Sequence, residues 1–339
     1  MKLLRWYYSP ILMLGAFWLP LSNTQAAEPN CTAIVNANGI VNLDIITPAN
    51  AKTASITVPL NYTCTNREIT TRYISVCLAV NSGDPTTPNF PPRYMKNTSD
   101  TTEKLAFTMT LPGNELWGSR NADGSEFNSG HRQTSGRGTF SGSVPITVKL
   151  QSVNENLFAT PGEYSLNFNG AHTFLTTEDR LFQVSSDCSG VDQQNQRFPF
   201  MVKATVIPSC SVTSTSDVNL GSHSANEKNF TAQNSSAINV TCTKGTPYTI
   251  GLTPSNGNQT GLGEMTGTSG NTDKINYQLY STPGIENKWG NTATSNNVGN
   301  GVVGTGDGNS QLKTVYVTVP SADFKPDKYT DIVGIQVNY

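Results

Sequence analysis

The sequence alternates apolar and polar residues in short runs, which clusters of Gly, Pro, Asn and Ser separate. Such period-two runs are typical of β-strands that bury one face. Clear examples are Val144-Pro-Ile-Thr-Val-Lys-Leu150 and Thr314-Val-Tyr-Val-Thr-Val319. No convincing amphipathic helical run accompanies them, so the pattern predicts an all-β protein.

The pattern repeats in the two halves of the chain. Alternating apolar residues precede Cys64 in the first half and Cys242 in the second. In both halves a later run leads through a loop to a Pro-x-x-Tyr segment, at Pro161 to Tyr164 and at Pro326 to Tyr329. The repeat predicts two immunoglobulin-like β-sandwiches in series. We expect the first over residues 27–206 and the second over residues 207–339.

The two halves differ at their ends. Residues 165–207 leave room in the first half for further strands, including the run Phe198 to Ile207, whereas only residues 330–339 follow Tyr329. If the first sandwich is complete, the second lacks its last strand and exposes a hydrophobic groove beside an unpaired edge. The usual cover for such an edge is a strand from another chain. We therefore expect an incomplete C-terminal sandwich whose last strand a partner chain supplies.

The final run alternates, and its odd positions are expected to face this groove. These positions are Val333, Ile335, Val337 and Tyr339. The alternative is an ordinary core strand.

Charged residues are scarce, at 14% of the chain, and the formal net charge is −2. A nucleic-acid binder needs a basic surface to neutralise phosphates. The composition therefore argues against nucleic-acid partners.

The first 26 residues have the pattern of a secretory signal peptide. A basic start is followed by the apolar run Ile11 to Leu21 and by small residues that place the cleavage point after Ala26. This predicts export of the mature chain.

Six cysteines follow the signal peptide, an even number that indicates three disulfides in an exported protein. Six cysteines allow fifteen connectivities. The similar spacing of two pairs favours Cys31 with Cys64 and Cys210 with Cys242, which leaves Cys77 with Cys188.

Catalytic and metal-binding motifs are weak. There is no G-x-S-x-G motif, no C-x-x-C pair, and the three histidines His131, His172 and His223 stand far apart. We expect no enzyme activity, no cofactor and no metal site.

Several segments of the second half resemble the spore-coat-U family of secreted pilin domains. In order, they are Pro208-Ser-Cys210-Ser-Val, Val240-Thr-Cys242-Thr-Lys-Gly-Thr-Pro-Tyr-Thr-Ile-Gly-Leu252, Ile275-Asn-Tyr-Gln-Leu-Tyr280, Lys288-Trp-Gly290, Val315-Tyr-Val-Thr-Val-Pro320 and Tyr329-Thr-Asp-Ile-Val-Gly-Ile-Gln-Val-Asn-Tyr339. The two-domain form resembles the tip adhesin of Csu-type archaic chaperone-usher pili. The first half shares only the cysteine frame and the late strands.

This resemblance implies an N-terminal adhesin domain and a C-terminal pilin domain, exported through the periplasm to the cell surface at the pilus tip. The implied partners are a periplasmic pilus chaperone, an outer-membrane usher and the N-terminal donor strand of the adjacent subunit. The final run would pair first with the chaperone and later with that donor strand. Only Ala27 to Asn30 precede Cys31, too few residues for a donor strand. We therefore expect the chain to accept a strand and to supply none.

Loops at the far end of the first sandwich are candidates for contact with an abiotic or host surface, and the resemblance favours biofilm formation through exposed hydrophobic loops. The segments expected to reach that end are residues 111–142 and 170–197, with the early turn at residues 36–39 as another candidate. Simple strand counting places the loop of Leu157 and Phe158 nearer the second sandwich. The apolar candidates are Ala37, Ile40, Val41, Leu116, Trp117, Phe127, Leu157, Phe158, Phe174 and Leu175. The first alternative is that these residues pack back onto the core. Others are a lectin-like tip that uses Trp117, Tyr94, Asn121 and Asp123, and a non-adhesive pilus initiator or minor structural subunit.

Overall fold

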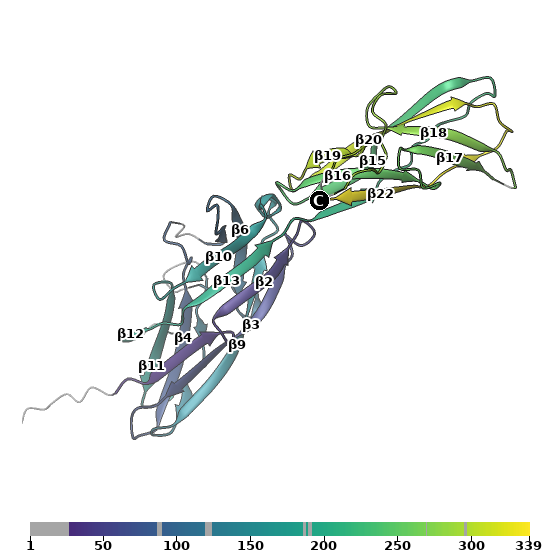
Figure 1. Ribbon diagram of the computed structural model, residues 1–339. Coiled ribbons are helices and arrows are strands. Elements are labelled where there is room, and N and C mark those ends of the chain that lie inside the picture. Colours follow the sequence, from purple (N-terminus) through teal and green to yellow (C-terminus); the bar gives the residue numbers. More distant parts are fainter. Residues whose placement is uncertain are drawn as a thin grey trace, which may run out of the picture.

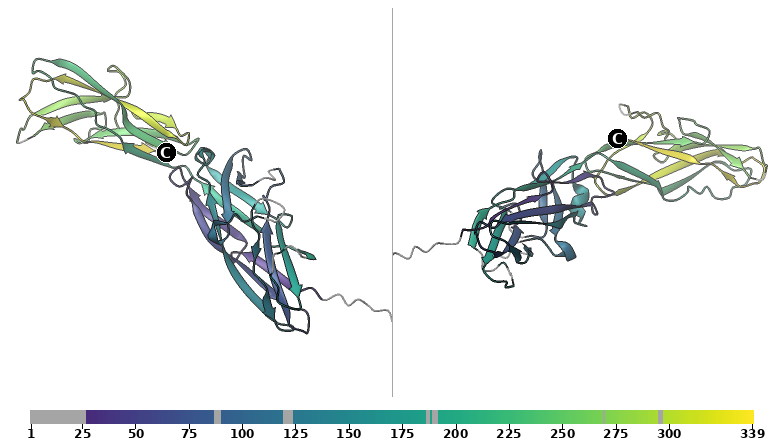
Figure 2. Two further views of the ribbon diagram at one scale, coloured as in Figure 1. Left: turned by 180° about the vertical axis from the view of Figure 1, so that it is seen from behind. Right: turned by 90° about the horizontal axis from the view of Figure 1, so that it is seen from below.

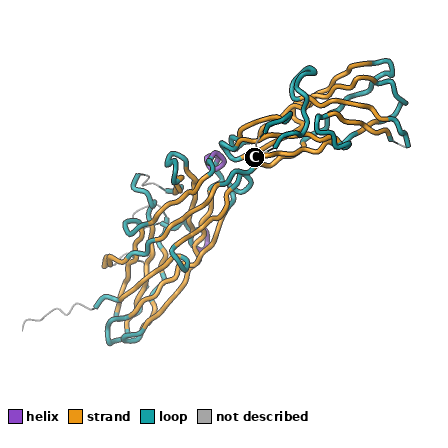
Figure 3. The backbone as a smooth tube through the Cα atoms, in the orientation of Figure 1, coloured by secondary structure: helices purple, strands orange, loops and turns teal. Residues whose placement is uncertain are grey.

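The computed structural model describes residues 27–86, 90–118, 124–185, 188, 192–268, 270–294 and 297–339. Strands dominate these residues, and they form two elongated units that lie end to end (Figure 1). The backbone view shows loops at both ends of each unit (Figure 3). Two short 3-10 helices, η1 (Pro112–Asn114) and η2 (Asn154–Phe158), interrupt the strands of the first unit. None of the described helices is long and apolar enough to cross a membrane.

The N-terminal unit is a sandwich of two sheets. The larger has the strand order β1-β3-β9-β6-β5-β10-β13-β2, and the smaller has the order β12-β11-β4-β7 with β8 also paired to β4. The strands are β1 (Asn30–Val35), β2 (Ile40–Ile46), β3 (Ser55–Thr65), β4 (Arg72–Val80), β5 (Arg93–Asn97), β6 (Lys104–Thr110), β7 (Phe127–Asn128), β8 (Arg132–Thr134), β9 (Thr139–Leu150), β10 (Gly162–Phe168), β11 (Thr173–Arg180), β12 (Asp192–Gln196) and β13 (Phe200–Val206).

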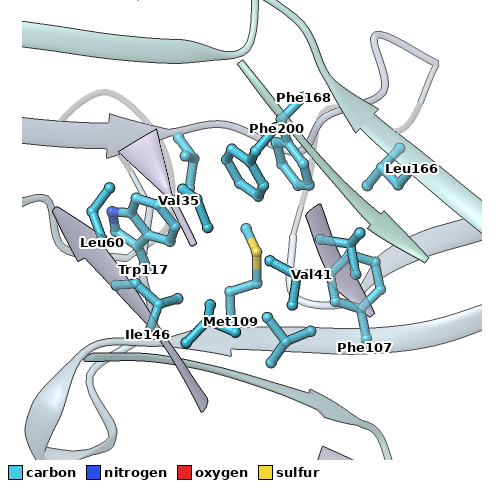
Figure 4. Close-up of a cluster of buried hydrophobic side chains, with 14 of the residues drawn as sticks. Val35, Val41, Leu60, Phe107, Met109, Trp117, Ile146, Leu166, Phe168 and Phe200 are labelled. Atoms are coloured by element: carbon cyan, nitrogen blue, oxygen red, sulfur yellow. The ribbon is translucent and has the colours of Figure 1, made fainter. Parts of the chain in front are cut away.

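Alternate side chains of these strands fill the space between the two sheets. On β9, for example, Val144, Ile146, Val148 and Leu150 are buried, while the intervening residues are wholly or partly exposed. Figure 4 shows part of this core, with Trp117, Met109 and Phe200 among aliphatic side chains.

The C-terminal unit is also a two-sheet sandwich. One sheet has the order β14-β15-β20-β18-β17-β21, and the other has the order β19-β16-β22. The strands are β14 (Cys210–Ser214), β15 (Lys228–Cys242), β16 (Pro247–Pro254), β17 (Leu262–Gly267), β18 (Lys274–Tyr280), β19 (Val302–Thr305), β20 (Ser310–Ser321), β21 (Tyr329–Thr330) and β22 (Val333–Asn338). Its core is a separate cluster that includes Trp289, Ile250 and Val317.

The internal repeat is visible in the pairing of the strands. Cys31 pairs with Cys64 across β1 and β3, as Cys210 pairs with Cys242 across β14 and β15. Strand β11 pairs with β4 as β22 pairs with β16. Both Pro-x-x-Tyr segments form the same corner, because the Tyr hydroxyl donates to the carbonyl four residues earlier, at 2.8 Å in each unit.

Three disulfides join Cys31 to Cys64, Cys77 to Cys188 and Cys210 to Cys242. These are the pairs that the cysteine spacing favours. The first and third tie together adjacent strands at the same place in each unit, whereas the second ties β4 to the segment that follows β11.

The two units meet at a short junction between β13 and β14. The Lys244 ammonium lies 2.8 Å from the Glu103 carboxylate of the other unit. Gly308 packs so closely against η2 that a Cβ placed there would lie 2.0 Å from the Leu157 carbonyl oxygen. The C-terminus lies beside this junction in all views (Figure 2).

Candidate functional surfaces

Strand β22 lies at the edge of its sheet. It pairs with β16 on one side, and none of the described strands pairs with its other side. The equivalent strand of the N-terminal unit, β11, pairs with β4 on one side and with β12 on the other. Strand β10, the equivalent of β21, likewise pairs with β13. Among the described residues, the C-terminal unit has no counterpart of β12 and β13.

Side-chain burial also differs between the two units. On β13, Phe200, Val202, Ala204 and Val206 are buried. On β22, Val333, Ile335 and Val337 contact the core but remain half-buried, and Tyr339 is 60% exposed. The C-terminal unit thus has an apolar strip along β22, a strand with one unpaired edge. Val333, Ile335 and Val337, which were expected to face a groove, pack against this core.

The opposite wall of this strip is the segment between β14 and β15. Val218 and Leu220 pack against the core from this segment, and the ring of His223 stacks on Phe230 with the two centroids 3.7 Å apart. The carbonyl oxygen of Leu220 and the nearby carboxylate of Glu227 raise the pKa of His223. The segment is not paired as a strand, in contrast to β2, its counterpart beside β13.

The second candidate surface is the end of the N-terminal unit that lies away from the junction, which we call the far pole. Register pairs locate it, because Thr65 lies beside Asn30 and Thr139, and Arg180 lies beside Tyr73. The far pole comprises the loops at residues 66–71, 135–138 and 181–185.

Four large apolar side chains of the far pole are exposed to solvent. They are Ile69 at 80%, Phe182 at 78%, Leu181 at 57% and Val184 at 49% of full exposure. Exposed single apolar residues are common on protein surfaces, but a group at one end of a molecule marks an interaction site.

The loops of the far pole are anchored to the sandwich by polar contacts. The Asn66 side chain donates to the carbonyl oxygens of Thr70, Thr134 and Ser135, and the Arg137 amide donates to the Glu68 carbonyl at 2.9 Å. These bonds hold the first two loops side by side.

The third loop is anchored by a buried histidine. Nδ1 of His131 lies 2.7 Å from the Val184 carbonyl oxygen, and its Nε2 lies 3.6 Å from the carboxylate of Glu178. Arg180 binds the other oxygen of that carboxylate at 2.9 Å. Both ring nitrogens of His131 therefore face oxygens that accept hydrogen bonds.

Three of the apolar surface candidates from the sequence are buried, so their selection as surface residues was wrong. Val41, Trp117 and Leu175 are core residues with no measurable exposure. The Trp117 indole nitrogen donates to the Leu78 carbonyl at 3.0 Å, and its ring stacks on Phe200. The hydrogen bond satisfies the polar end of the indole, and core packing holds its apolar ring.

The guanidinium of Arg93 reinforces the position of Trp117. It donates to the Trp117 carbonyl oxygen at 2.7 Å and lies over the Phe90 ring at 4.0 Å. Burial lowers the pKa of Arg93 to about 9. For the lectin-like alternative, Trp117 is thus inaccessible, Tyr94 is half-buried, and Asn121 and Asp123 lie outside the described residues.

Two further candidates lie at the junction, on the side where strand counting places their loop. Leu157 and Phe158 belong to η2 and pack against Gly308 of the C-terminal unit. The remaining candidates are exposed or half-buried along the sides of the sandwich. These are Ala37, Ile40, Leu116, Phe127 and Phe174.

The sequence analysis missed the four apolar residues of the far pole as individual candidates. Leu181, Phe182 and Val184 lie in the 170–197 connection, which was expected to reach the pole. Ile69 is a lone apolar residue within the polar run Asn66 to Thr71, and this isolation was the available signal.

Residues 196–336 match the family model of the Spore Coat Protein U domain, so the resemblance inferred from the C-terminal motifs is confirmed. No curated protein matches the chain. The fold is similar to that in the complex of CsuC and CsuE, described as a chaperone-tip adhesion subunit pre-assembly complex from archaic chaperone-usher Csu pili of Acinetobacter baumannii. That match has a TM-score of 0.50 and 16% identity, and covers 91% of this chain and 100% of that chain.

Two further tip proteins are similar at lower scores. CfaE, the adhesive subunit of CFA/I fimbria of enterotoxigenic Escherichia coli, matches with a TM-score of 0.33 and 10% identity over 88% of this chain and 92% of its own. The CupB6 tip adhesin from Pseudomonas aeruginosa matches with a TM-score of 0.31 and 10% identity over 91% and 94%. The chain has the immunoglobulin-like fold of a chaperone-usher pilus subunit.

Proposed function

We propose that the protein is the adhesive tip subunit of a chaperone-usher pilus and that it attaches cells to abiotic or host surfaces during biofilm formation. Its N-terminal unit is the adhesin, and its C-terminal unit is the pilin domain that joins it to the pilus. A signal peptide at residues 1–26 directs export to the periplasm. There a chaperone holds the subunit, an outer-membrane usher assembles it, and the donor strand of the adjacent subunit completes its fold.

The observation that carries the adhesive part of this proposal is the group of exposed apolar side chains at the far pole. This pole is the end of the N-terminal unit away from the junction, whereas β22 lies in the C-terminal unit and ends beside the junction (Figure 1). A subunit joined to a pilus through β22 would present the far pole outward. Full burial of an Ile or Phe side chain contributes about 1.5 to 3 kcal/mol, so Ile69 and Phe182 together could supply roughly 3 to 6 kcal/mol per contact. Many pili per cell multiply this gain.

The observation that supports the assembly part is the half-buried apolar strip along β22. A strand added beside β22 would satisfy its free backbone groups and bury Val333, Ile335 and Val337. The order of partners, with the chaperone first and the donor strand later, follows the assembly that the resemblance implies.

The adhesive role is tested with the double variant Ile69→Ser/Phe182→Ser in piliated cells. We expect attachment to polystyrene to fall at least tenfold while the amount of assembled pili is unchanged. The matched control is Val303→Ser, which removes an equally apolar and 58% exposed side chain from the C-terminal unit. Unchanged attachment of the double variant would favour the non-adhesive initiator or minor structural subunit.

The assembly role is tested by co-purification of the mature protein with its chaperone. Ile335→Asp places a charge in the apolar strip and should abolish the one-to-one complex, whereas Gln336→Ala on the outward face should leave it intact. A stable monomer that does not bind the chaperone, with or without Ile335→Asp, would contradict the proposal that β22 pairs with a strand from another chain.

A further inference from the structure

The far pole carries an excess of arginine, although the whole chain has a formal charge of −2. The segments 65–73, 131–138 and 178–185 contain five arginines against three carboxylates. The arginines are Arg67, Arg72, Arg132, Arg137 and Arg180, and the carboxylates are Glu68, Glu178 and Asp179. Positive charge and exposed apolar side chains therefore share one end of the molecule.

Two of these arginines form ion pairs within the protein. Arg72 binds Asp179 at 2.8 Å, and Arg180 binds Glu178 at 2.9 Å. The remaining carboxylate, Glu68, accepts a hydrogen bond from the backbone nitrogen of Ala27. The three acids are thus occupied by contacts within the protein.

The other three arginines, Arg67, Arg132 and Arg137, are exposed, and none of them forms an ion pair with another residue of the described chain. Arg67 is two residues from Ile69. The backbone of Arg137 is bonded to Glu68, and the adjacent Gly136 packs against the Ile69 backbone. Two unpaired guanidinium groups therefore come from residues directly beside Ile69, the most exposed apolar side chain of the far pole.

We propose that the far pole binds membranes that contain anionic lipids. This inference rests on the proposed role of the far pole as the attachment surface. The apolar side chains of Ile69, Leu181, Phe182 and Val184 enter the boundary between headgroups and acyl chains, and the guanidinium groups bind lipid phosphates. Arginine suits this role because its planar donors match phosphate geometry.

Charge complementarity favours this target over a neutral apolar solid. A plain polymer surface can bury the four apolar side chains but offers the guanidinium groups no partners. An anionic membrane can bury the apolar side chains and also bind the guanidinium groups. Each cationic residue near an anionic membrane strengthens binding by roughly fivefold, so two arginines together account for about twenty-fivefold.

The test measures binding of the full chain, held in its chaperone complex, to lipid vesicles. One set contains phosphatidylcholine alone, and the other contains the same lipid with about a third phosphatidylglycerol. We expect at least tenfold tighter binding to the anionic vesicles. This preference should largely vanish at about 1 M salt, where the screening length falls to roughly 3 Å.

The variant Arg67→Gln/Arg137→Gln should reduce binding to the anionic vesicles by about twenty-fivefold and leave binding to phosphatidylcholine unchanged. The matched control, Lys149→Gln/Lys203→Gln, removes the same charge from strands β9 and β13 and should have no effect. Co-purification of each variant with the chaperone reports that it still folds.

Equal binding to both kinds of vesicle, or an undiminished preference in the arginine variant, would overturn the inference. Binding to polystyrene without binding to either vesicle would also overturn it, while leaving the proposed adhesive function in place. Failure of the adhesive function itself has a different signature, because the variant Ile69→Ser/Phe182→Ser would then attach normally.

Discussion

The histidine beneath the third loop of the far pole yields a quantitative prediction. Nδ1 of His131 lies 2.7 Å from the Val184 carbonyl oxygen, and Nε2 faces Glu178 at 3.6 Å. The Val184 carbonyl oxygen can only accept a hydrogen bond, so Nδ1 of His131 donates to it.

The variant His131→Ala removes the ring that donates to the Val184 carbonyl oxygen. Loss of one good hydrogen bond costs about 1 kcal/mol, which corresponds to roughly fivefold in an equilibrium constant. We therefore expect backbone amides of residues 181–185 to exchange about fivefold faster in the variant than in the unmodified chain. Other strands should keep their exchange rates.

Hydrogen exchange with mass spectrometry on the chaperone complex measures the effect. The matched control is His172→Ala, which removes a histidine that contacts the Asn81 amide at the other end of β11. Equal protection of residues 181–185 in His131→Ala and in the unmodified chain would refute the reasoning.

Two further predictions concern stability and the junction. A hydrogen bond from Lys96, together with hydrogen bonds from Thr86, holds the pKa of Asp84 at about 2, below the ordinary value for an aspartate. These contacts contribute about 2 kcal/mol of stability above pH 4, which is lost as pH falls toward 2. In urea unfolding, Lys96→Met should remove most of that acid-dependent loss, and an unchanged pH profile would contradict it. Gly308→Ala should open the junction, seen as a changed scattering profile of the complex, whereas Gly245→Ala has the same backbone strain without a nearby atom and should leave the profile unchanged.

The sequence predicted the β architecture because strand periodicity is a local signal. The repeat was readable from the cysteine spacing and the Pro-x-x-Tyr segments, and the structure gives both Tyr164 and Tyr329 the same hydroxyl contact.

The exposed residues of the far pole were harder to predict, because exposure at a loop depends on contacts that are distant in sequence. From the sequence, Trp117 looks like an exposed aromatic residue of a loop. In the structure its indole N–H donates a hydrogen bond to the carbonyl oxygen of Leu78, which belongs to a strand far earlier in the chain. Neither Ile69 nor Phe182 lies in a run of alternating apolar and polar residues. Their shared location follows from the pairing of β4 with β8 and β11, which no local pattern contains.

The most direct test of the account is the force needed to detach a single pilus from a methyl-terminated probe. Pili with the unmodified tip should show a rupture event at the pilus end, and pili with Ile69→Ser/Phe182→Ser should extend without it while remaining assembled. Equal rupture forces for the two tips would contradict the assignment of the far pole as the adhesive surface.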